Sequence, residues 1–236
     1  MEGRKRVLLK LSGEILAGDE RFGLSRRPID EICAEISEAA SSGVGIAIVV
    51  GGGNILRGTQ AKDLGMDRVQ ADQMGMLATV INALALQDAL ERHGAPARVQ
   101  TAVNMGSVAE PFIRRRAIKH LDRGRIVIFA GGTGSPFFST DTAAALRASE
   151  INADRLLKAT KVNGIYDKDP VKFPDAKFLP SLSYSDVLDK RIEVMDSTAF
   201  VHCMDNKIPN VLVRMVERGN LAKLLLKGES IGSIVS

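Results

Sequence analysis

Glycine-rich turns follow three apolar runs in this sequence of 236 residues. Lys10, Val50 and Ala130 end these runs. The turns after them contain, in chain order, Ser12-Gly13, Gly51-Gly52-Gly53 and Gly131-Gly132-Thr133-Gly134. Glycines at such positions let backbone N–H groups approach a ligand, and the N-terminus of a following helix adds positive potential. Because phosphates are the usual ligands of such turns, several of them in one chain predict a phosphorylated ligand.

Charged side chains suited to phosphoryl transfer lie near these turns. The reaction requires positive charge on the transferring group and an acid that organises the metal or the lysines. Lys10 at a strand end, Arg57 after the triple glycine and Asp141 at a helix start supply such groups. Their ordinary alternatives are an exposed strand residue, a surface arginine and a helix N-cap. Asp169 alone is typical of a turn, and Asp72 alone is typical of a solvated helix.

Two familiar phosphate motifs are absent. Residues 53–59 have the glycine spacing of a P-loop, but Thr59 stands where the P-loop has its lysine. The dinucleotide fingerprint G-x-G-x-x-G is incomplete whether it begins at Gly51 or at Gly132, because Leu56 or Phe137 takes the last glycine position. The sequence therefore predicts neither a P-loop NTPase nor a Rossmann dehydrogenase, and it also lacks the protein-kinase signature.

Alternating strands and helices must position these groups. Apolar runs predict strands at 7–11, 45–50, 98–102, 125–130, 156–159 and 210–215. Helical spacing predicts helices near 28–36, 69–90, 113–121, 141–151, 184–188, 197–205 and 221–226, and turn signals indicate a hairpin within 160–182. This alternation predicts an α/β fold with an open, largely parallel central sheet between helical layers. Ligands of such sheets bind outside the carboxyl ends of the strands, where the glycine turns fall.

Composition excludes several classes of protein. Apolar residues make up 45% and charged residues 25%, which excludes disordered, collagen-like and coiled-coil chains. No run approaches the roughly 20 apolar residues of a membrane span, and the basic N-terminus lacks the long apolar stretch of a signal peptide. We therefore expect a cytoplasmic protein with no membrane partner. The net charge of +4 permits acidic ligands, but without Trp or a known motif we expect no nucleic acid partner.

The sequence resembles the bacterial uridylate (UMP) kinases of the amino acid kinase family. The similarity spans nearly the whole chain. Its matching stretches are 10–14, 51–54 with Arg57-Gly58, 72–79, 132–141, 158–164 with Tyr166 and Asp169-Pro170, and 194–196. Residues 74–79 and 134–141 are the specific ones. The strand-end lysine and the triple glycine indicate only the wider family, whose other members phosphorylate carboxylates or carbamate.

The resemblance implies a role for each matching residue. The catalytic residues would be Lys10, Arg57, Asp141 and Lys161, with Asp141 orienting the lysines or the metal-bound nucleotide. The ATP site would contain Lys10, Leu11, Ser12, Gly13, Gly53, Arg57, Thr160, Tyr166 and Asp169. The UMP site would contain Gly52, Asp72, Thr133, Gly134, Ser135, Pro136, Phe137, Phe138, Ser139 and Thr140. A loop for the effector GTP would contain Gly18, Asp19, Glu20, Arg21, Phe22 and Gly23.

The resemblance also implies an architecture and a reaction. The fold would be an amino acid kinase-like αβα sandwich with one domain over 1–236, in which an N-lobe (about 1–150) holds UMP and a C-lobe (about 151–236) holds the adenosine of ATP. The enzyme would use Mg²⁺ with ATP, respond to GTP as activator and UTP as inhibitor, and form a homohexamer. The pattern over 69–90 is apolar on more than one helical face, which favours such an assembly.

Two departures and two alternatives accompany this interpretation. Ser135 stands where Asn is expected, and Ser139 where Thr is more usual, although both keep a hydrogen-bonding side chain. One alternative is a carboxylate kinase of the same fold, of the acetylglutamate or aspartate type, which would lack Asp72 and the loop at 133–138. The other is a non-catalytic member that only binds a ligand, against which the intact Lys10, Arg57 and Asp141 argue.

Overall fold

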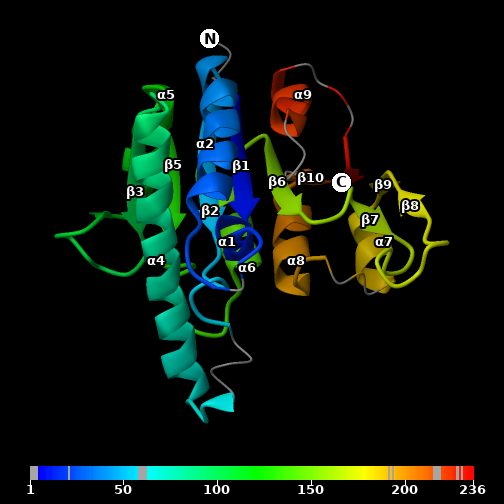
Figure 1. The fold of residues 1–236 in the computed structure, drawn as a ribbon. Coiled ribbons are helices and arrows are strands. Elements are labelled where there is room, and N and C mark those ends of the chain that lie inside the picture. Colours follow the sequence, from blue (N-terminus) through cyan, green and yellow to red (C-terminus); the bar gives the residue numbers. More distant parts are fainter. Residues whose placement is uncertain are drawn as a thin grey trace.

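A computed structural model describes residues 5–20, 22–57, 63–190, 192, 194–214, 219–226, 229 and 231–236. A nine-stranded sheet with the order β4-β3-β5-β2-β1-β6-β10-β11-β9 forms its centre (Figure 1). The strands are β1 Arg6–Leu11, β2 Gly45–Val50, β3 Ala97–Thr101, β4 Glu110–Pro111, β5 Ile126–Ala130, β6 Arg155–Thr160, β9 Ser181–Leu182, β10 Asn210–Arg214 and β11 Ser233–Val235. All neighbours are parallel except β10 and β11. The predicted open, largely parallel sheet is confirmed.

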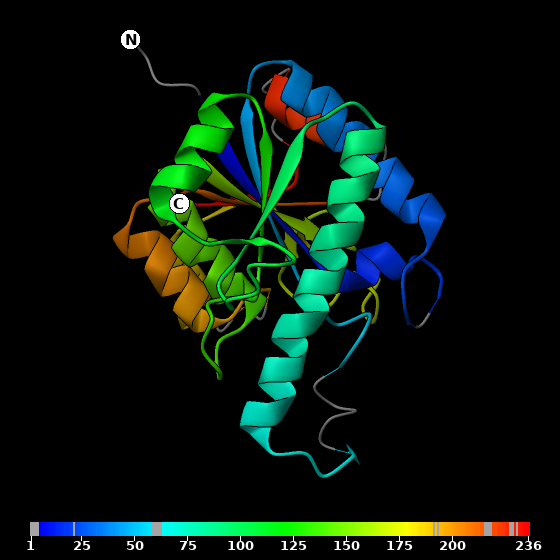
Figure 2. The same ribbon diagram turned by 90° about the vertical axis from the view of Figure 1, so that its left-hand side faces the viewer.

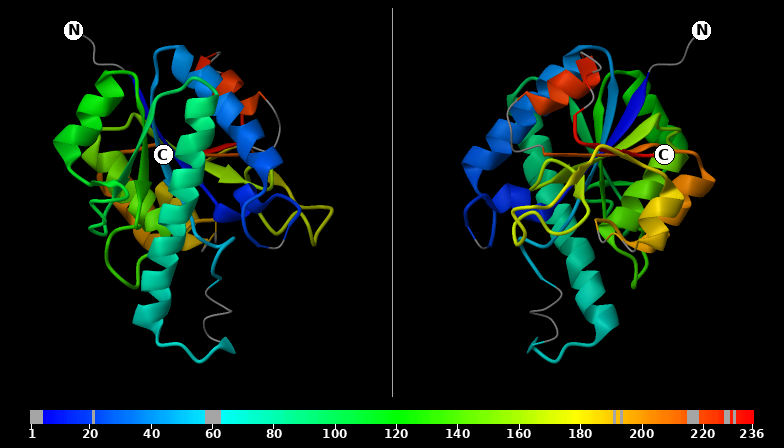
Figure 3. Two further views of the ribbon diagram at one scale, coloured as in Figure 1. Left: turned by 60° about the vertical axis from the view of Figure 1, so that its left-hand side comes forward. Right: turned by 90° about the vertical axis from the view of Figure 1, so that its right-hand side faces the viewer.

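Helices cover both faces of this sheet (Figures 2 and 3). On one face lie α1 (Gly13–Ala17), α2 (Arg26–Ser41), α4 (Arg68–Arg92) and α9 (Asn220–Leu226). On the other lie α5 (Arg114–Asp122), α6 (Thr140–Glu150), α7 (Tyr184–Asp189) and α8 (Ser197–Asp205). Among the described residues, no helix has both the length and the apolar character needed to cross a membrane.

Side chains of the central strands alternate between the two layers. Leu9 and Leu11 pack toward α2 and α4, whereas Leu8 packs toward α6. Successive side chains of a strand point to opposite faces, so Lys10 shares the face of Leu8 and is directed toward α6. This alternation decides which helix can supply a partner for Lys10.

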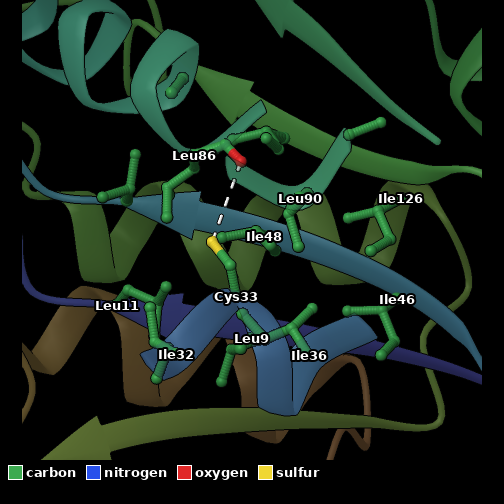
Figure 4. Packing of buried hydrophobic residues seen from close by; sticks show 14 of the residues in the cluster. Leu9, Leu11, Ile32, Cys33, Ile36, Ile46, Ile48, Leu86, Leu90 and Ile126 are labelled. Carbon is green, nitrogen blue, oxygen red and sulfur yellow. Dashed lines mark hydrogen bonds between the residues drawn. The ribbon is translucent and has the colours of Figure 1, made fainter. Parts of the chain in front are cut away.

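The core between the sheet and α2 is dry and close-packed. Cys33 of α2 lies among Leu9, Ile48, Leu86 and Leu90, and its thiol points toward the carbonyl oxygen of Leu86 at 3.9 Å (Figure 4). Burial raises the pKa of this thiol to about 12, so Cys33 stays uncharged. This cysteine is a core residue, as a small apolar side chain would be.

Short elements were the least predictable. The sequence indicated only a turn after Leu11, but α1 begins at Gly13, where the Ser12 side chain accepts a hydrogen bond from the Glu14 N–H. A five-residue helix is too short to show a periodic pattern. The strands β4, β9 and β11 were missed for the same reason. The predicted hairpin is present as β7 (Ile165–Tyr166) paired antiparallel with β8 (Phe178–Leu179).

Candidate active site

Three charged side chains meet beneath the carboxyl edge of the sheet. Lys10 of β1 and Lys158 of β6 are direct neighbours in the parallel register. Their Nζ atoms lie 2.7 Å and 2.5 Å from the two carboxylate oxygens of Asp141, in the first turn of α6. The three side chains are between 10% and 13% exposed. A single buried carboxylate therefore holds two cations. These three groups together carry one positive charge, and the nearby carboxylate of Asp196 also attracts Lys158.

The environment fixes the charge states of this cluster. Burial opposes ionisation of Asp141, but Lys10 and Lys158 outweigh it and hold the pKa of the carboxyl group below its usual value. Burial also lowers the pKa of Lys158, and repulsion by Lys10 adds to this lowering. Attraction by Asp141 opposes it. The pKa of Asp141 therefore keeps it ionised at neutral pH, and the carboxylate is the natural anchor of the lysine pair.

A second set of contacts fixes the start of α6. The Ser139 hydroxyl accepts hydrogen bonds from the N–H groups of Asp141 (3.0 Å) and Thr142 (3.1 Å) and donates one to Asp196. Thr142 also donates to Asp196 at 2.8 Å, and Lys158 donates to the carbonyl oxygen of Val194 at 2.5 Å. Ser139 is thus the N-cap of α6, and Asp141 lies inside the helix. The alternative interpretation of Asp141 as a helix N-cap is therefore wrong.

A cavity of about 550 Å³ opens beside this cluster. The predicted UMP residues that line it are Gly52, Asp72, Thr133, Ser135, Phe138 and Thr140, and Gly53 lines it too. Thr140, which lines the cavity, directly precedes Asp141, whereas Lys10, Asp141 and Lys158 are not themselves among the lining residues. Gly134, Pro136, Phe137 and Ser139 belong to the same loop but are not among the lining residues.

The triple glycine packs tightly against α4. A Cβ atom at Gly52 would lie 2.8 Å from the Cβ of Ala78 and 2.9 Å from the carbonyl oxygen of Gly75. Real Cβ atoms do not approach so closely, so only glycine fits there. The Thr79 hydroxyl accepts a hydrogen bond from the Gly131 N–H at 2.7 Å, which ties α4 to the next turn as well. Helix α4 therefore forms one wall of the cavity.

Asp72 joins this wall to the loop across the cavity. Its carboxylate pairs with Arg68 one turn earlier (2.9 Å) and accepts a hydrogen bond from the Phe137 N–H (2.8 Å). Phe137 has a positive φ of 71°, a conformation that a non-glycine residue rarely adopts. Arg68 also lines the cavity. The sequence analysis missed Arg68, although its spacing of four residues from Asp72 on a helix was a usable signal.

Arg57 and Lys161 form a separate cluster. Both pair with Glu14, at 3.4 Å and 2.5 Å, at the start of α1. Lys161 hydrogen-bonds to this carboxylate and lowers the pKa of Glu14, and Arg57 adds to the effect against partial burial. The four predicted catalytic residues are therefore not one group: Lys10 and Asp141 share the buried cluster with Lys158, whereas Arg57 and Lys161 share an exposed one with Glu14.

The remaining predicted donor residues lie along and beyond β6. Thr160 ends β6 and donates to the carbonyl oxygen of Val162 at 2.6 Å. Tyr166 on β7 stacks edge to face on Phe178, with ring centroids 5.5 Å apart. Asp169 accepts a hydrogen bond from the Val171 N–H at 2.9 Å, as in a turn. Leu11, Ser12 and Gly13 form the junction of β1 and α1.

The predicted effector loop lies against the triple-glycine turn. The Gly23 N–H donates to the carbonyl oxygen of Asn54 (2.8 Å), and the Asn54 side chain donates to the carbonyl oxygen of Gly23 (2.7 Å). The Phe22 ring lies 5.9 Å from the Arg57 guanidinium. Gly18 caps α1, Asp19 and Glu20 are exposed, and Arg21 falls outside the described residues.

The described residues contain no group of three or more His, Cys, Asp or Glu side chains that could hold a metal ion. Both oxygens of Asp141 already face a lysine.

The fold and the lysine cluster can now be set beside known proteins. The chain belongs to the amino acid kinase family, whose model matches residues 5–214. It is similar to the crystal structure of UMP kinase from Bacillus anthracis, with 40% identity, a TM-score of 0.95, and coverage of 98% of this chain and 96% of that one. It is also similar to UMP kinase from Ureaplasma parvum, with 33% identity, a TM-score of 0.93 and 99% coverage of both chains. Uridylate kinase from Archaeoglobus fulgidus is more distant, at 26% identity and a TM-score of 0.76, with coverage of 98% of this chain and 99% of that one.

Removal of the shared carboxylate tests the buried cluster. We expect Asp141→Asn to lower the free energy of unfolding by roughly 3–5 kcal/mol, because two buried lysines lose their counter-charge. The double variant Asp141→Asn/Lys158→Met should recover part of this loss, since one of the two lysines is then gone. Urea unfolding at pH 7 measures both. A double variant less stable than Asp141→Asn would contradict the assignment of Asp141 as the counter-charge of both lysines.

Proposed function

We propose that this chain is a UMP kinase, which transfers the γ-phosphoryl group of ATP to UMP and yields UDP and ADP. The observation that carries the proposal is the buried Lys10–Asp141–Lys158 cluster, in which Asp141 directly follows in sequence a loop, 132–140, that lines a cavity together with Gly52 and Gly53. Similarity to UMP kinases over nearly the full chain supports it. The product would enter pyrimidine nucleotide synthesis, in the cytoplasm, where both substrates occur.

In this proposal UMP binds in the cavity and ATP binds on the side of β6. Asp72 and the loop 133–140 would hold UMP in the N-lobe, with Gly52 beneath it. Thr160, Tyr166 and Asp169 would hold the adenosine in the C-lobe, so that the γ-phosphate reaches the ends of β1 and β6. The C-lobe and N-lobe share one continuous sheet, which keeps the two sites in a fixed relation.

Charge neutralisation and positioning would perform the chemistry. The attacking oxygen of the UMP phosphate is already anionic near neutral pH, so no general base is needed. Lys10 and Lys158 lie where negative charge develops on the transferring group, and Asp141 keeps them in place before the substrates arrive. Mg²⁺ bound to ATP would neutralise further phosphate charge. Arg57 and Lys161 would approach the phosphates from the exposed side.

An ADP-release assay with different acceptors tests the function. We expect activity with UMP and Mg-ATP, and at most weak activity with CMP, acetylglutamate, aspartate or no acceptor. Lys10→Met should lower kcat by roughly 10²–10³-fold, which is typical for the loss of one preorganised electrostatic group. Its UMP affinity should stay nearly unchanged. Activity with a carboxylate acceptor, or no turnover with any acceptor, would support one of the two alternatives.

Recognition of UMP is tested at Asp72. A carboxylate that faces the cavity suits the ribose hydroxyls of UMP, so we expect Asp72→Ala to raise KM for UMP by roughly 10–100-fold, with little change in KM for ATP. Asp88→Ala is the matched control, because Asp88 also pairs with an arginine four residues away on α4. Equal loss of affinity for both substrates would show that Asp72 is structural.

The exposed face of α4 supports a homohexamer. Met74, Leu77, Ile81 and Leu84 recur at helical spacing and are between 36% and 47% exposed. The opposite face of the helix is buried against the sheet and α2. Four large apolar side chains in one stripe favour contact with a second copy of the chain. We include activation by GTP and inhibition by UTP in the proposal, with residues 18–23 as the GTP loop.

A charge in this stripe tests the assembly. We expect Ile81→Glu to convert the hexamer into smaller species at micromolar concentration, because a carboxylate would be buried between copies. Val171→Glu is the control, since Val171 is 81% exposed and lies away from α4. Light scattering measures the mass of each. A wild-type monomer would contradict the proposal, and a hexamer that ignores GTP and UTP would contradict its regulatory half.

A further inference from the structure

Glu14 brings together two cations from different parts of the chain. Its carboxylate lies 2.5 Å from the Lys161 Nζ and 3.4 Å from the Arg57 guanidinium. Arg57 follows β2, and Lys161 directly follows β6. The sheet order places β1, which precedes Glu14, between these two strands. The three side chains therefore converge at the carboxyl edge of the sheet, just beyond the end of the strand that contains Lys10.

This position lies just beyond the strand ends that carry Lys10 and Lys158. Ligands of open parallel sheets bind outside the carboxyl ends of the strands. Of the four cations in the two clusters, Arg57 and Lys161 are the more exposed, with side chains 43% and 73% exposed. A polyphosphate that reaches the lysine cluster would thus meet Glu14, a negative charge, beside the two cations that would attract it.

A phosphate group can replace Glu14 in its ion pairs with Arg57 and Lys161. Exposed ion pairs contribute little to stability, because solvent screens them and the long side chains lose freedom. The Glu14 side chain is itself 34% exposed. A phosphate group offers more negative charge and more acceptor oxygens than one carboxylate, and both guanidinium and ammonium groups bind it well.

We propose that Glu14 is a phosphate placeholder: it holds Arg57 and Lys161 in the empty enzyme and yields them to the phosphates of the donor nucleotide. The inference rests on the proposed function for the identity of that nucleotide, and it goes beyond it in giving Glu14 a role. Glu14 is then a positioning residue whose negative charge sets how tightly the site binds polyphosphates. The exchange orders the two cations before binding and lowers the affinity for polyphosphates.

Removal of the charge should strengthen polyphosphate binding. We expect Glu14→Gln to lower the Kd for inorganic tripolyphosphate by roughly threefold to tenfold at 0.05 M salt, because two exposed pairs no longer compete. The gain should shrink at 1 M salt, where the Debye length falls to about 3 Å. Isothermal titration calorimetry measures both values. A merely structural role predicts weaker binding, so an unchanged or raised Kd would overturn the proposal.

The matched control is Glu31→Gln. Glu31 pairs with Arg27 at 2.8 Å on α2 and carries the same charge, but it belongs to neither cation cluster. Its substitution changes the net charge equally, and we expect no change in the Kd for tripolyphosphate. An equal gain in affinity for tripolyphosphate in both variants would show that only the net charge matters, and it would overturn the placeholder role.

A measurement on the wild-type chain makes the test independent of folding of the variant. Lys161 and Arg57 hold the pKa of Glu14 below its usual value, so their transfer to phosphate should raise it. Carboxyl carbon NMR of Glu14 with saturating tripolyphosphate measures this rise, and no rise would overturn the proposal. Tripolyphosphate contains no nucleoside, so its binding does not depend on the proposed function. If Glu14→Gln binds it more tightly as expected but the enzyme does not phosphorylate UMP, the proposed function is rejected and the role of Glu14 is retained.

Discussion

The shared carboxylate of Asp141 is the contact on which the arrangement of the site depends. Two lysines side by side in a parallel sheet repel each other, and burial makes that repulsion stronger than it would be in water. A carboxylate with one oxygen for each lysine converts this conflict into a stable group with one positive charge left over. That charge is largely buried and held in a fixed position, and under the proposed function it would bind phosphate without further reorganisation.

Several features of the fold position this carboxylate and its two lysines. Strand alternation directs Lys10 toward the layer of α6, and the parallel pairing of β1 with β6 places Lys158 beside it. Asp141 lies in the first turn of α6, where the helix dipole favours a negative charge. Ser139 and Asp196 fix this turn through hydrogen bonds from two directions. Each of these contacts limits the freedom of this carboxylate.

The two cation clusters differ in physical character and therefore in what they can do. The cluster around Asp141 is largely buried, so its electrostatic interactions are strong and its geometry is fixed. The cluster of Glu14, Arg57 and Lys161 is partly exposed, so its pairs are weak and exchangeable. A phosphoryl-transfer site benefits from both kinds: a fixed group where charge develops, and an adaptable group where the substrate enters. The cavity wall at Gly52 and Asp72 adds shape, since α4 approaches Gly52 too closely for any side chain there.

The sequence by itself determined the alternation of strands and helices, the glycine turns, and Lys10 and Asp141 as candidate charges. These depend on local patterns: apolar runs, glycines at strand ends and the start of a helix. Lys158 shows why local patterns were not enough, because it is one lysine within an apolar strand and acquires its role only from the register of β6 against β1. The same holds for Glu14, whose two partners follow strands that are remote in sequence and adjacent only in the sheet. Tertiary structure alone decided these pairings, because strand order and register arise from packing across the whole core.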